Sequence, residues 1–230
     1  MPVSPEPLRI AAYYAPAAED RLAEAAASWL GRDAASGAMR TQPDLPDIAA
    51  ITADARRYGF HATLKPPMRL IPGAGFADIL AATRRIAAGI AAFTLPALSV
   101  QAVHGFVALR EQTPCQALQD LADACVGGLD PLRAPPDAAE LARRRRSALS
   151  PLQDAMLQRW GYPYVFQTWF FHMTLTCRLE EAARAAWIDA ARAHFAAALA
   201  QPRRVEAISL FVQDEAGAPF RIAARVALSG

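Results

Sequence analysis

The sequence is almost free of lysine. Its basic residues number 24, and all but Lys65 are arginine. They face 22 acidic residues, so the formal net charge is only +2. A balance this even does not mark a protein that seeks long nucleic acid, nor a strongly acidic one. Against the arginine bias the position of Lys65 is informative, because it stands two residues after Thr63.

Cysteine is scarce too, with Cys115, Cys125 and Cys177 and no Cys-x-x-Cys spacing. This usage favours reduced thiols in a cytoplasmic protein over a disulfide framework. The sequence also lacks His-x-His, His-Glu-x-x-His and any cysteine cluster at the spacing of metal ligands. We therefore predict no metal site and no cofactor.

Long apolar stretches are few. Met1–Ile10 has no apolar core segment, so no signal peptide is expected. The stretch from Ala87 to Leu109 carries no charge and is long enough to span a membrane. It contains polar residues and glycines, however, and its apolar residues alternate, which predicts a helix end followed by strands. No membrane partner is expected.

The residue pattern predicts an α+β chain with an internal repeat, folded as one domain over residues 1–230. Each half shows a motif strand, then a helix, then two strands. The predicted strands are Leu8–Tyr14, Arg57–Leu70, two within Phe93–Arg110 (the second Val103–Arg110), Gln167–Arg178, Arg203–Val212 and Pro219–Leu228. The predicted helices are Glu19–Leu30, Phe76–Ala92, Thr113–Leu129, about 138–159 and Glu180–Ala200. Residues 31–56 read as loop with one short helix, and residues 130–165 as an insertion between the halves.

The repeat centres on a five-residue phrase, Phe-His-x-Thr-Leu. It occurs at residues 60–64 and again at residues 171–175, and it uses two of the four histidines. In a strand, side chains two positions apart share a face. Each phrase therefore places a histidine and a threonine, His61 with Thr63 and His172 with Thr174, on one face, with phenylalanine and leucine on the other.

This pairing suits acid–base chemistry on a phosphate ester. A histidine and the threonine two positions on lie about 6.6 Å apart along a strand, a gap that a phosphate can span. One imidazole can act as general base and the other as general acid, without a metal. The threonine hydroxyls would hold the non-bridging oxygens as charge builds. By the same parity, Lys65 is expected on this face as a further positive contact.

Other residues are weaker candidates for substrate contacts. The run Arg143–Arg146 spans a full helical turn, so it is either a solvated face or supplies one or two arginines, such as Arg143, to a second phosphate. Tyr162 and Tyr164 either pack or wall a cleft. Tyr58 falls on the opposite face by strict alternation unless the backbone bends at Gly59. His104, before Gly105 in a predicted strand, and His194 read as structural.

The paired phrases resemble the 2H phosphoesterase superfamily, which is defined by two His-x-Thr/Ser motifs and includes cyclic phosphodiesterases and RNA 2′-5′ ligase-like proteins. The stretches Tyr58–Pro67, Gly105–Leu109, Glu140–Arg145 and Trp160–Tyr164 look like a bacterial subgroup linked to phosphonate metabolism. The resemblance implies two pseudo-symmetric lobes, each an antiparallel sheet with helices outside, around a central cleft with one motif per lobe. It also implies catalysis by His61 and His172 and phosphate binding by Thr63 and Thr174.

The sequence thus predicts a metal-independent hydrolase that opens a small cyclic phosphate ester. In the context that the resemblance implies, a sugar cyclic phosphate such as ribose 1,2-cyclic phosphate is a plausible substrate. Two alternatives stay open. One is an enzyme of RNA 2′,3′-cyclic phosphate ends, for which short RNA would be the partner. The other is a module that binds a nucleotide or phosphate ester without turnover. The oligomeric state cannot be read from the sequence.

Overall fold

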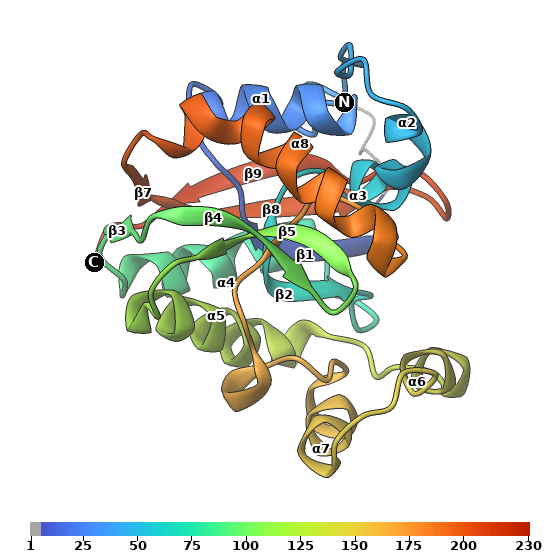
Figure 1. Ribbon diagram of the computed structural model, residues 1–230. Helices are drawn as coiled ribbons and strands as arrows, with labels where there is room; N and C mark the ends of the chain where they lie inside the picture. Colours follow the sequence, from blue (N-terminus) through green and yellow to red (C-terminus); the bar gives the residue numbers. More distant parts are fainter. Residues whose placement is uncertain (1–5) are drawn as a thin grey trace.

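A computed structural model describes residues 6–230 of the chain (Figure 1). The prediction about a signal peptide rests partly on residues 1–5, which lie outside this part. The strands are β1 (Arg9–Tyr14), β2 (Ala62–Met68), β3 (Phe93–Leu95), β4 (Leu98–Val103), β5 (Phe106–Glu111), β6 (Met173–Thr174), β7 (Arg203–Val205), β8 (Ala207–Gln213) and β9 (Arg221–Ala227). The α-helices are α1 (Arg21–Leu30), α2 (Ile48–Ile51), α3 (Ala53–Tyr58), α4 (Phe76–Ala88), α5 (Gln116–Leu129), α6 (Ala138–Arg144), α7 (Pro151–Trp160) and α8 (Glu181–Leu199). Two short 3-10 helices cover Asp130–Leu132 and Phe166–Thr168.

The predicted α+β class is confirmed. Seven strands form a sheet in the order β4-β5-β6-β2-β1-β8-β9, in which all registered neighbours are antiparallel, and β3 pairs with β7 separately. The sheet has two parts, β9-β8-β1-β2 and β6-β5-β4, each holding one motif strand. They meet at one register pair, Ala62 with Met173.

The two halves of the chain exchange hairpins. After β2 the chain forms α4, β3 and the hairpin β4-β5, yet that hairpin pairs with β6 of the second half. After β6 it forms α8, β7 and the hairpin β8-β9, which pairs with β1 and so continues to β2 of the first half. The repeated order of elements is therefore present, but each motif strand belongs to a sheet built from both halves.

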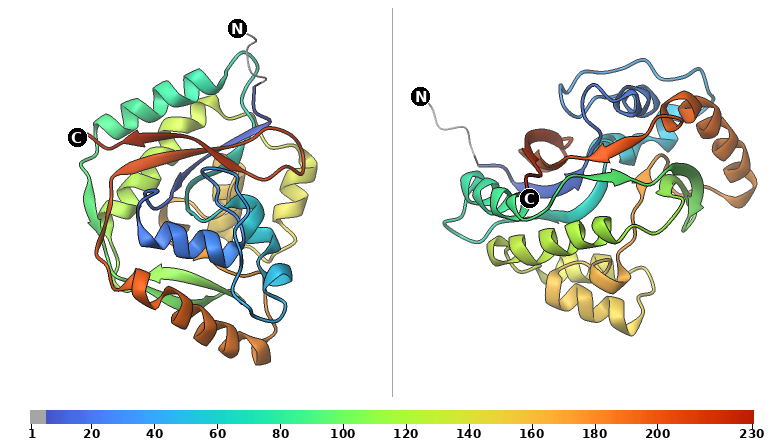
Figure 2. Two further views of the ribbon diagram at one scale, coloured as in Figure 1. Left: turned by 90° about the horizontal axis from the view of Figure 1, so that it is seen from above. Right: turned by 90° about the vertical axis from the view of Figure 1, so that its left-hand side faces the viewer.

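Two helix pairs, α1 with α8 and α4 with α5, pack on the main apolar core, and a smaller buried cluster includes Tyr13 and Phe211. In the view of Figure 1, α1 lies above the strands with α8 in front of it, and α5 lies below the strands with α4 beside it. The segment with α6 and α7 lies below α5, far from α1 and α8, and the side view in Figure 2 shows the same placement. No helix in the described residues combines the length and apolar character needed to cross a membrane.

Several predicted elements differ from the observed ones. The strand expected over Arg57–Leu70 is shortened to β2, because Arg57 and Tyr58 are the last residues of α3. The helix expected over 138–159 is two helices, because Ser150 and Gln153 form a capping box with Pro151 at the first position and so begin α7. His104 is not in a strand. It has a φ of 46° and, with Gly105 at 92°, forms the two-residue turn between β4 and β5. The second motif strand shrinks from Gln167–Arg178 to Met173–Thr174.

Candidate functional site

The repeated phrases alternate as predicted. Phe60, Ala62 and Leu64 are buried in the core, and so are Phe171, Met173 and Leu175. The histidines and threonines between them are partly exposed. Because Ala62 is the register partner of Met173, the residues that flank this pair, His61, Thr63, His172 and Thr174, turn away from the core at one place. The indole Nε1 of Trp169 also donates to the Thr63 carbonyl at 2.8 Å and ties the two segments together.

A cleft of about 530 Å³ opens beside the register pair. Its wall contains three of the four motif residues, His61, Thr63 and Thr174. The fourth, His172, is not among the residues of this wall and stands two residues before Thr174, which is. The weaker candidates also reach the cleft, and they are Tyr58, Arg143, Tyr162 and Tyr164. The structure thus brings together residues from both halves and from the inserted segment.

Both imidazoles are held in the same way. His61 Nδ1 lies 2.8 Å from the carbonyl oxygen of Gly59, and His172 Nδ1 lies 3.2 Å from that of Phe170. A carbonyl oxygen can only accept, so in each ring Nδ1 carries the proton and donates it. In the neutral imidazoles Nε2 then has a free lone pair. Each ring presents one atom that can take up a proton or, once protonated, return it.

Aromatic stacking fixes the plane of each ring. His61 lies flat on Tyr13, with ring centroids 3.7 Å apart and an interplanar angle of 19°. His172 stacks on Phe170 at 4.6 Å and 24°. Together with the Nδ1 hydrogen bonds, these contacts leave little freedom to either side chain, which is the preorganisation that proton transfer requires.

The surroundings keep both histidines neutral near pH 7. Burial lowers the pKa of His61 from 6.5 to about 4, against the hydrogen bond to Gly59, and His172 lowers it further. Burial also lowers the pKa of His172, against the hydrogen bond to Phe170 and with the help of Arg110. The effect of His172 on the pKa of His61 is the one expected from a neighbouring imidazole that can carry a positive charge.

Tyr58 reaches the cleft because the backbone turns after it. Tyr58 is the last residue of α3, and Gly59 has a φ of 79°. A side chain at Gly59 would bring its Cβ within 2.6 Å of the Ala34 Cβ, so the position demands glycine. The bend makes strict alternation irrelevant for Tyr58, which stacks on Phe220 at 5.2 Å.

The four arginines of the run Arg143–Arg146 form two pairs with different surroundings. Arg143 and Arg144 line the cleft, and the Arg144 guanidinium lies 4.9 Å from the Tyr162 ring centroid. Arg145 turns away and pairs with Asp154 at 2.7 Å, while Arg146 is exposed. Two of the four arginines therefore line the cleft and two lie outside its wall, and a contact of Arg143 with a second phosphate stays a prediction.

Lys65 is a correction. It was expected on the cleft face, but its side chain has 0% exposure and lies on the core face. Thr63 is the register partner of Tyr13, and Lys65 is that of Ala12. Between these two pairs β2 moves on by two residues while β1 moves on by only one. This β-bulge places both Leu64 and Lys65 on the core side and breaks the parity on which the expectation rested.

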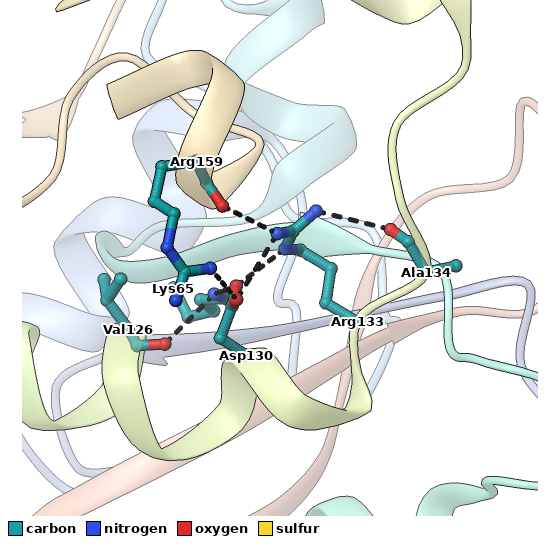
Figure 3. Close-up of polar contacts among 6 residues, drawn as sticks. All are labelled: Lys65, Val126, Asp130, Arg133, Ala134 and Arg159. Atoms are coloured by element: carbon teal, nitrogen blue, oxygen red, sulfur yellow. Dashed lines mark hydrogen bonds and ion pairs between the residues drawn. The ribbon is translucent and has the colours of Figure 1, made fainter. Parts of the chain in front are cut away.

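The buried Lys65 ammonium joins the sheet to the root of the inserted segment (Figure 3). Its Nζ donates to Asp130 Oδ1 at 2.8 Å and to the Val126 carbonyl at 3.1 Å. Asp130 also pairs with Arg133 at 2.7 Å and with Arg159 at 3.6 Å. Burial opposes ionisation of Asp130, but hydrogen bonds from Arg133 and Lys65 outweigh it and hold the pKa of this carboxyl below its ordinary value. One carboxylate thus fastens both ends of residues 130–160.

Sequence reasoning missed Arg9, Tyr13 and Arg144 as parts of the cleft. Tyr13 is only 1% exposed and forms the platform for His61. Arg9 and Tyr13 belong to no sequence motif. Arg144 could not be distinguished from its neighbours in the arginine run. Within residues 6–230, no group of three or more His, Cys, Asp or Glu side chains is placed to hold a metal ion.

The fold and site define an α+β protein with paired His-x-Thr strands beside an arginine- and tyrosine-lined cleft. The chain belongs to the family described as "Protein of unknown function (DUF1045)", whose model matches residues 63–221.

Two curated relatives share the name ribose 1,5-bisphosphate phosphokinase PhnN. The protein from Janthinobacterium sp. (strain Marseille) is 41% identical over 231 residues, which cover 96% of this chain and 51% of the relative. The protein from Laribacter hongkongensis (strain HLHK9) is 40% identical over 218 residues, covering 94% and 50%. This chain therefore spans about half the length of the relatives it matches.

Among solved structures, the chain is similar to E. coli LigT complexed with 3′-AMP, with a TM-score of 0.46 and 17% identity over 98% of this chain and 99% of LigT. It is also similar to a protein described as a phosphoesterase, with a TM-score of 0.44 and 15% identity over 98% of this chain and 100% of the other. Likeness at this level says nothing of activity.

Proposed function

We propose that the cleft hydrolyses a small cyclic phosphate ester by two-histidine acid–base catalysis. The observation that carries this proposal is the matched pair of imidazoles. Each has Nδ1 bound to the carbonyl two residues earlier, and they flank the one register pair between β2 and β6. A phosphodiester held between them would have a proton acceptor on one side and a proton donor on the other.

The reaction balances with these two groups alone. One neutral Nε2 takes a proton from water as the water oxygen attacks phosphorus. The protonated Nε2 of the other ring gives its proton to the ester oxygen as the P–O bond of the ring breaks. Thr63 and Thr174 would donate hydrogen bonds to the non-bridging oxygens. The product is a phosphomonoester beside a free hydroxyl, and the two histidines have exchanged protonation states.

The proposed substrate class is a ribose cyclic phosphate. The cleft, at about 530 Å³, suits a small molecule. The relatives are named for ribose 1,5-bisphosphate, and the resemblance to a phosphonate-linked subgroup favours a sugar phosphate as well. Ribose 1,2-cyclic phosphate, with or without a 5-phosphate, meets both indications.

The kinase activity in the relatives' name is not carried over to this chain. Phosphate-binding loops of many kinases contain Gly-x-x-x-x-Gly-Lys-Ser/Thr, in which the lysine reaches the nucleotide phosphates. The one lysine here, Lys65, follows Leu64 and is buried against Asp130. It is not available to a nucleotide.

The test is phosphorus NMR of the protein with a panel of cyclic phosphates in excess chelator. The panel holds ribose 1,2-cyclic phosphate 5-phosphate, 2′,3′-cyclic nucleotides and a short RNA with a 2′,3′-cyclic end. Each is incubated with the wild type, His61→Ala and His172→Ala, and circular dichroism confirms that both variants are folded. We expect ring opening of the sugar compound, lost in both variants, with no effect of chelator.

The outcomes separate the alternatives. Ring opening of the RNA end alone would replace the sugar phosphate with an RNA substrate. Line broadening without turnover, retained in both histidine variants, would favour a binding module. Full activity of either folded histidine variant would refute the two-histidine mechanism.

A further inference from the structure

The cleft carries more positive charge than a cyclic phosphate needs. Arg9, Arg143 and Arg144 line it, and no acidic side chain does. A second cavity of about 520 Å³, near the start of α1, is different: Arg32, Arg40 and Arg225 are there balanced by Glu19, Asp20, Glu24 and Asp33. A cyclic phosphodiester has one negative charge, and Glu140, which pairs with Arg144, has another. The three arginines therefore still carry one positive charge that a further anionic group could neutralise.

We propose that Arg9, Arg143 and Arg144, with the hydroxyl groups of Tyr13 and Tyr162, form a subsite for a second phosphate. The substrate is then a cyclic phosphate that also carries a phosphomonoester, and the histidines act on the cyclic group alone. This inference rests on the proposed function, and it names the substrate class more narrowly. A phosphomonoester carries about −1.5 to −2 charges at pH 7 and three acceptor oxygens, which arginine recognises well.

Two of the three arginines, Arg9 and Arg144, are held in place by neighbouring side chains. The Arg9 Nε donates to Gln213 at 2.7 Å and its guanidinium lies 5.3 Å from the Phe220 ring centroid, while its terminal nitrogens have no partner among the described residues. Arg144 is fixed by Glu140 at 2.9 Å and by the face of Tyr162. Arg143 is 57% exposed and lies 4.0 Å from the same carboxylate, so it is free to swing toward a ligand.

Tyr13 gives an independent indication of a ligand. Its side chain is almost wholly buried, and it nevertheless lines the cleft. Burial raises the pKa of Tyr13 well above its ordinary value, and Tyr58, Tyr162, Arg9 and Arg144 are near enough to contribute. Burial also raises the pKa of Tyr162. Both phenols stay protonated and can donate to a phosphate oxygen.

The scaffold presents these groups on a fixed support. Arg143, Arg144 and Tyr162 belong to the inserted segment, and Asp130 fastens both of its ends (Figure 3). The subsite therefore pairs Arg9 and Tyr13 of β1 with residues from α6 and the loop after α7. Preorganised donors of this kind lose little freedom on binding.

The decisive experiment compares two substrates that differ only in the second phosphate, ribose 1,2-cyclic phosphate with and without the 5-phosphate. For the wild type we expect kcat/KM to be higher for the 5-phosphate compound by roughly 10- to 100-fold, as lost charge-assisted hydrogen bonds would predict. Arg144→Gln and Arg9→Gln should remove most of this preference. Arg144→Lys keeps the positive charge but loses the two-pronged guanidinium donor. It should therefore retain only part of the preference for the 5-phosphate compound.

Arg146→Gln is the matched control, because Arg146 is exposed and lies outside the cleft wall. It should keep the full preference. Calorimetric titration with ribose 5-phosphate gives a second readout that needs no turnover, and we expect its affinity to fall in Arg144→Gln but not in Arg146→Gln. Equal kcat/KM for the two cyclic compounds, or equal binding of ribose 5-phosphate by both variants, would overturn the subsite. Absence of turnover with selective binding retained would leave the subsite standing and refute the hydrolase.

Discussion

Ala62 and Met173 are register partners, and this one pair joins the two parts of the seven-stranded sheet. Both side chains are fully buried. Their neighbours on each side, a histidine before and a threonine after, therefore share the opposite face in antiparallel order. His61 stands toward Thr174, and Thr63 toward His172. The four motif residues therefore have an approximate two-fold arrangement within one chain.

The pH dependence follows from the depressed pKa values of both histidines. The proposed mechanism needs one neutral and one protonated imidazole. Since burial lowers the pKa of His61 to about 4 and lowers that of His172 below 6.5, the free enzyme loses its protonated ring as pH rises toward 6.5. We expect a bell-shaped profile of kcat/KM with its maximum on the acid side of neutrality.

The profile of kcat should lie at higher pH than that of kcat/KM. It reports the enzyme–substrate complex, in which an anionic phosphate raises the pKa of a neighbouring imidazole. Steady-state rates from pH 4 to 9 at constant ionic strength would measure both. A kcat/KM that keeps rising above pH 8 would contradict the acid–base pair.

Folding stability should fall on acidification for the same reason. The folded-state pKa of His61, about 4, is below its ordinary value of 6.5, so the unfolded chain binds more protons between these limits. The stabilisation is present above pH 6.5 and is lost as pH falls toward 4, by about 3 kcal/mol at most. Urea unfolding at pH 7 and pH 5 measures the loss. His61→Gln should show a smaller difference than the wild type, and an equal difference would argue against burial of the imidazole.

The threonine hydroxyls should act on the transition state. Thr63→Ala and Thr174→Ala each remove one proposed donor, and we expect kcat to fall by about 10²- to 10³-fold at most. Thr63→Ser and Thr174→Ser keep the hydroxyl and should recover most of the rate. Single-turnover rates beside a substrate titration separate the effect on chemistry from that on binding. A loss confined to KM, with serine no better than alanine, would assign the threonines to packing.

Asp130 should matter more to stability than its partner Lys65. Asp130→Asn leaves a wholly buried ammonium without its carboxylate, at a cost of about 3–5 kcal/mol. Lys65→Met leaves Asp130 with Arg133 and Arg159 and should cost less than about 1.5 kcal/mol. The double variant should recover part of the loss of Asp130→Asn. Urea unfolding of the three variants measures their free energies of unfolding. A larger loss in Lys65→Met than in Asp130→Asn would contradict this prediction.

Features that appear as a repeat or as an alternating pattern of apolar and polar residues could be predicted from the sequence. The two Phe-His-x-Thr-Leu phrases and the α+β class follow from local pattern, since burial on one face of a strand imposes a period of two. Lys65 shows the limit of parity, because a bulge depends on the pairing of β2 with β1 and leaves no mark in composition. The break before α7 was readable in Ser150, Pro151 and Gln153, and the arginine run obscured it.

The cleft wall was less predictable. Arg9 and Tyr13 come from β1, and Tyr162 follows α7, so only long-range packing brings them together. Tyr13 looks like any apolar strand residue, and no repeat singles it out. The candidate catalytic residues could be found from the sequence because they occur twice, whereas the groups that surround them occur once.

The exchange of hairpins also bears on how the chain folds during synthesis. The hairpin β4-β5 is synthesised soon after β2, but its partner strand β6 is synthesised later. In the same way, β1 can pair with β8 only after β8 has been synthesised. Contacts between residues this distant in the chain raise the contact order, and they slow folding because loop closure precedes the gain from pairing. Until Met173 is made, β5 exposes an unpaired edge toward its future neighbour. We expect nascent chains that stop before β6 to depend on chaperones, and the two halves, expressed separately, to gain structure only when mixed.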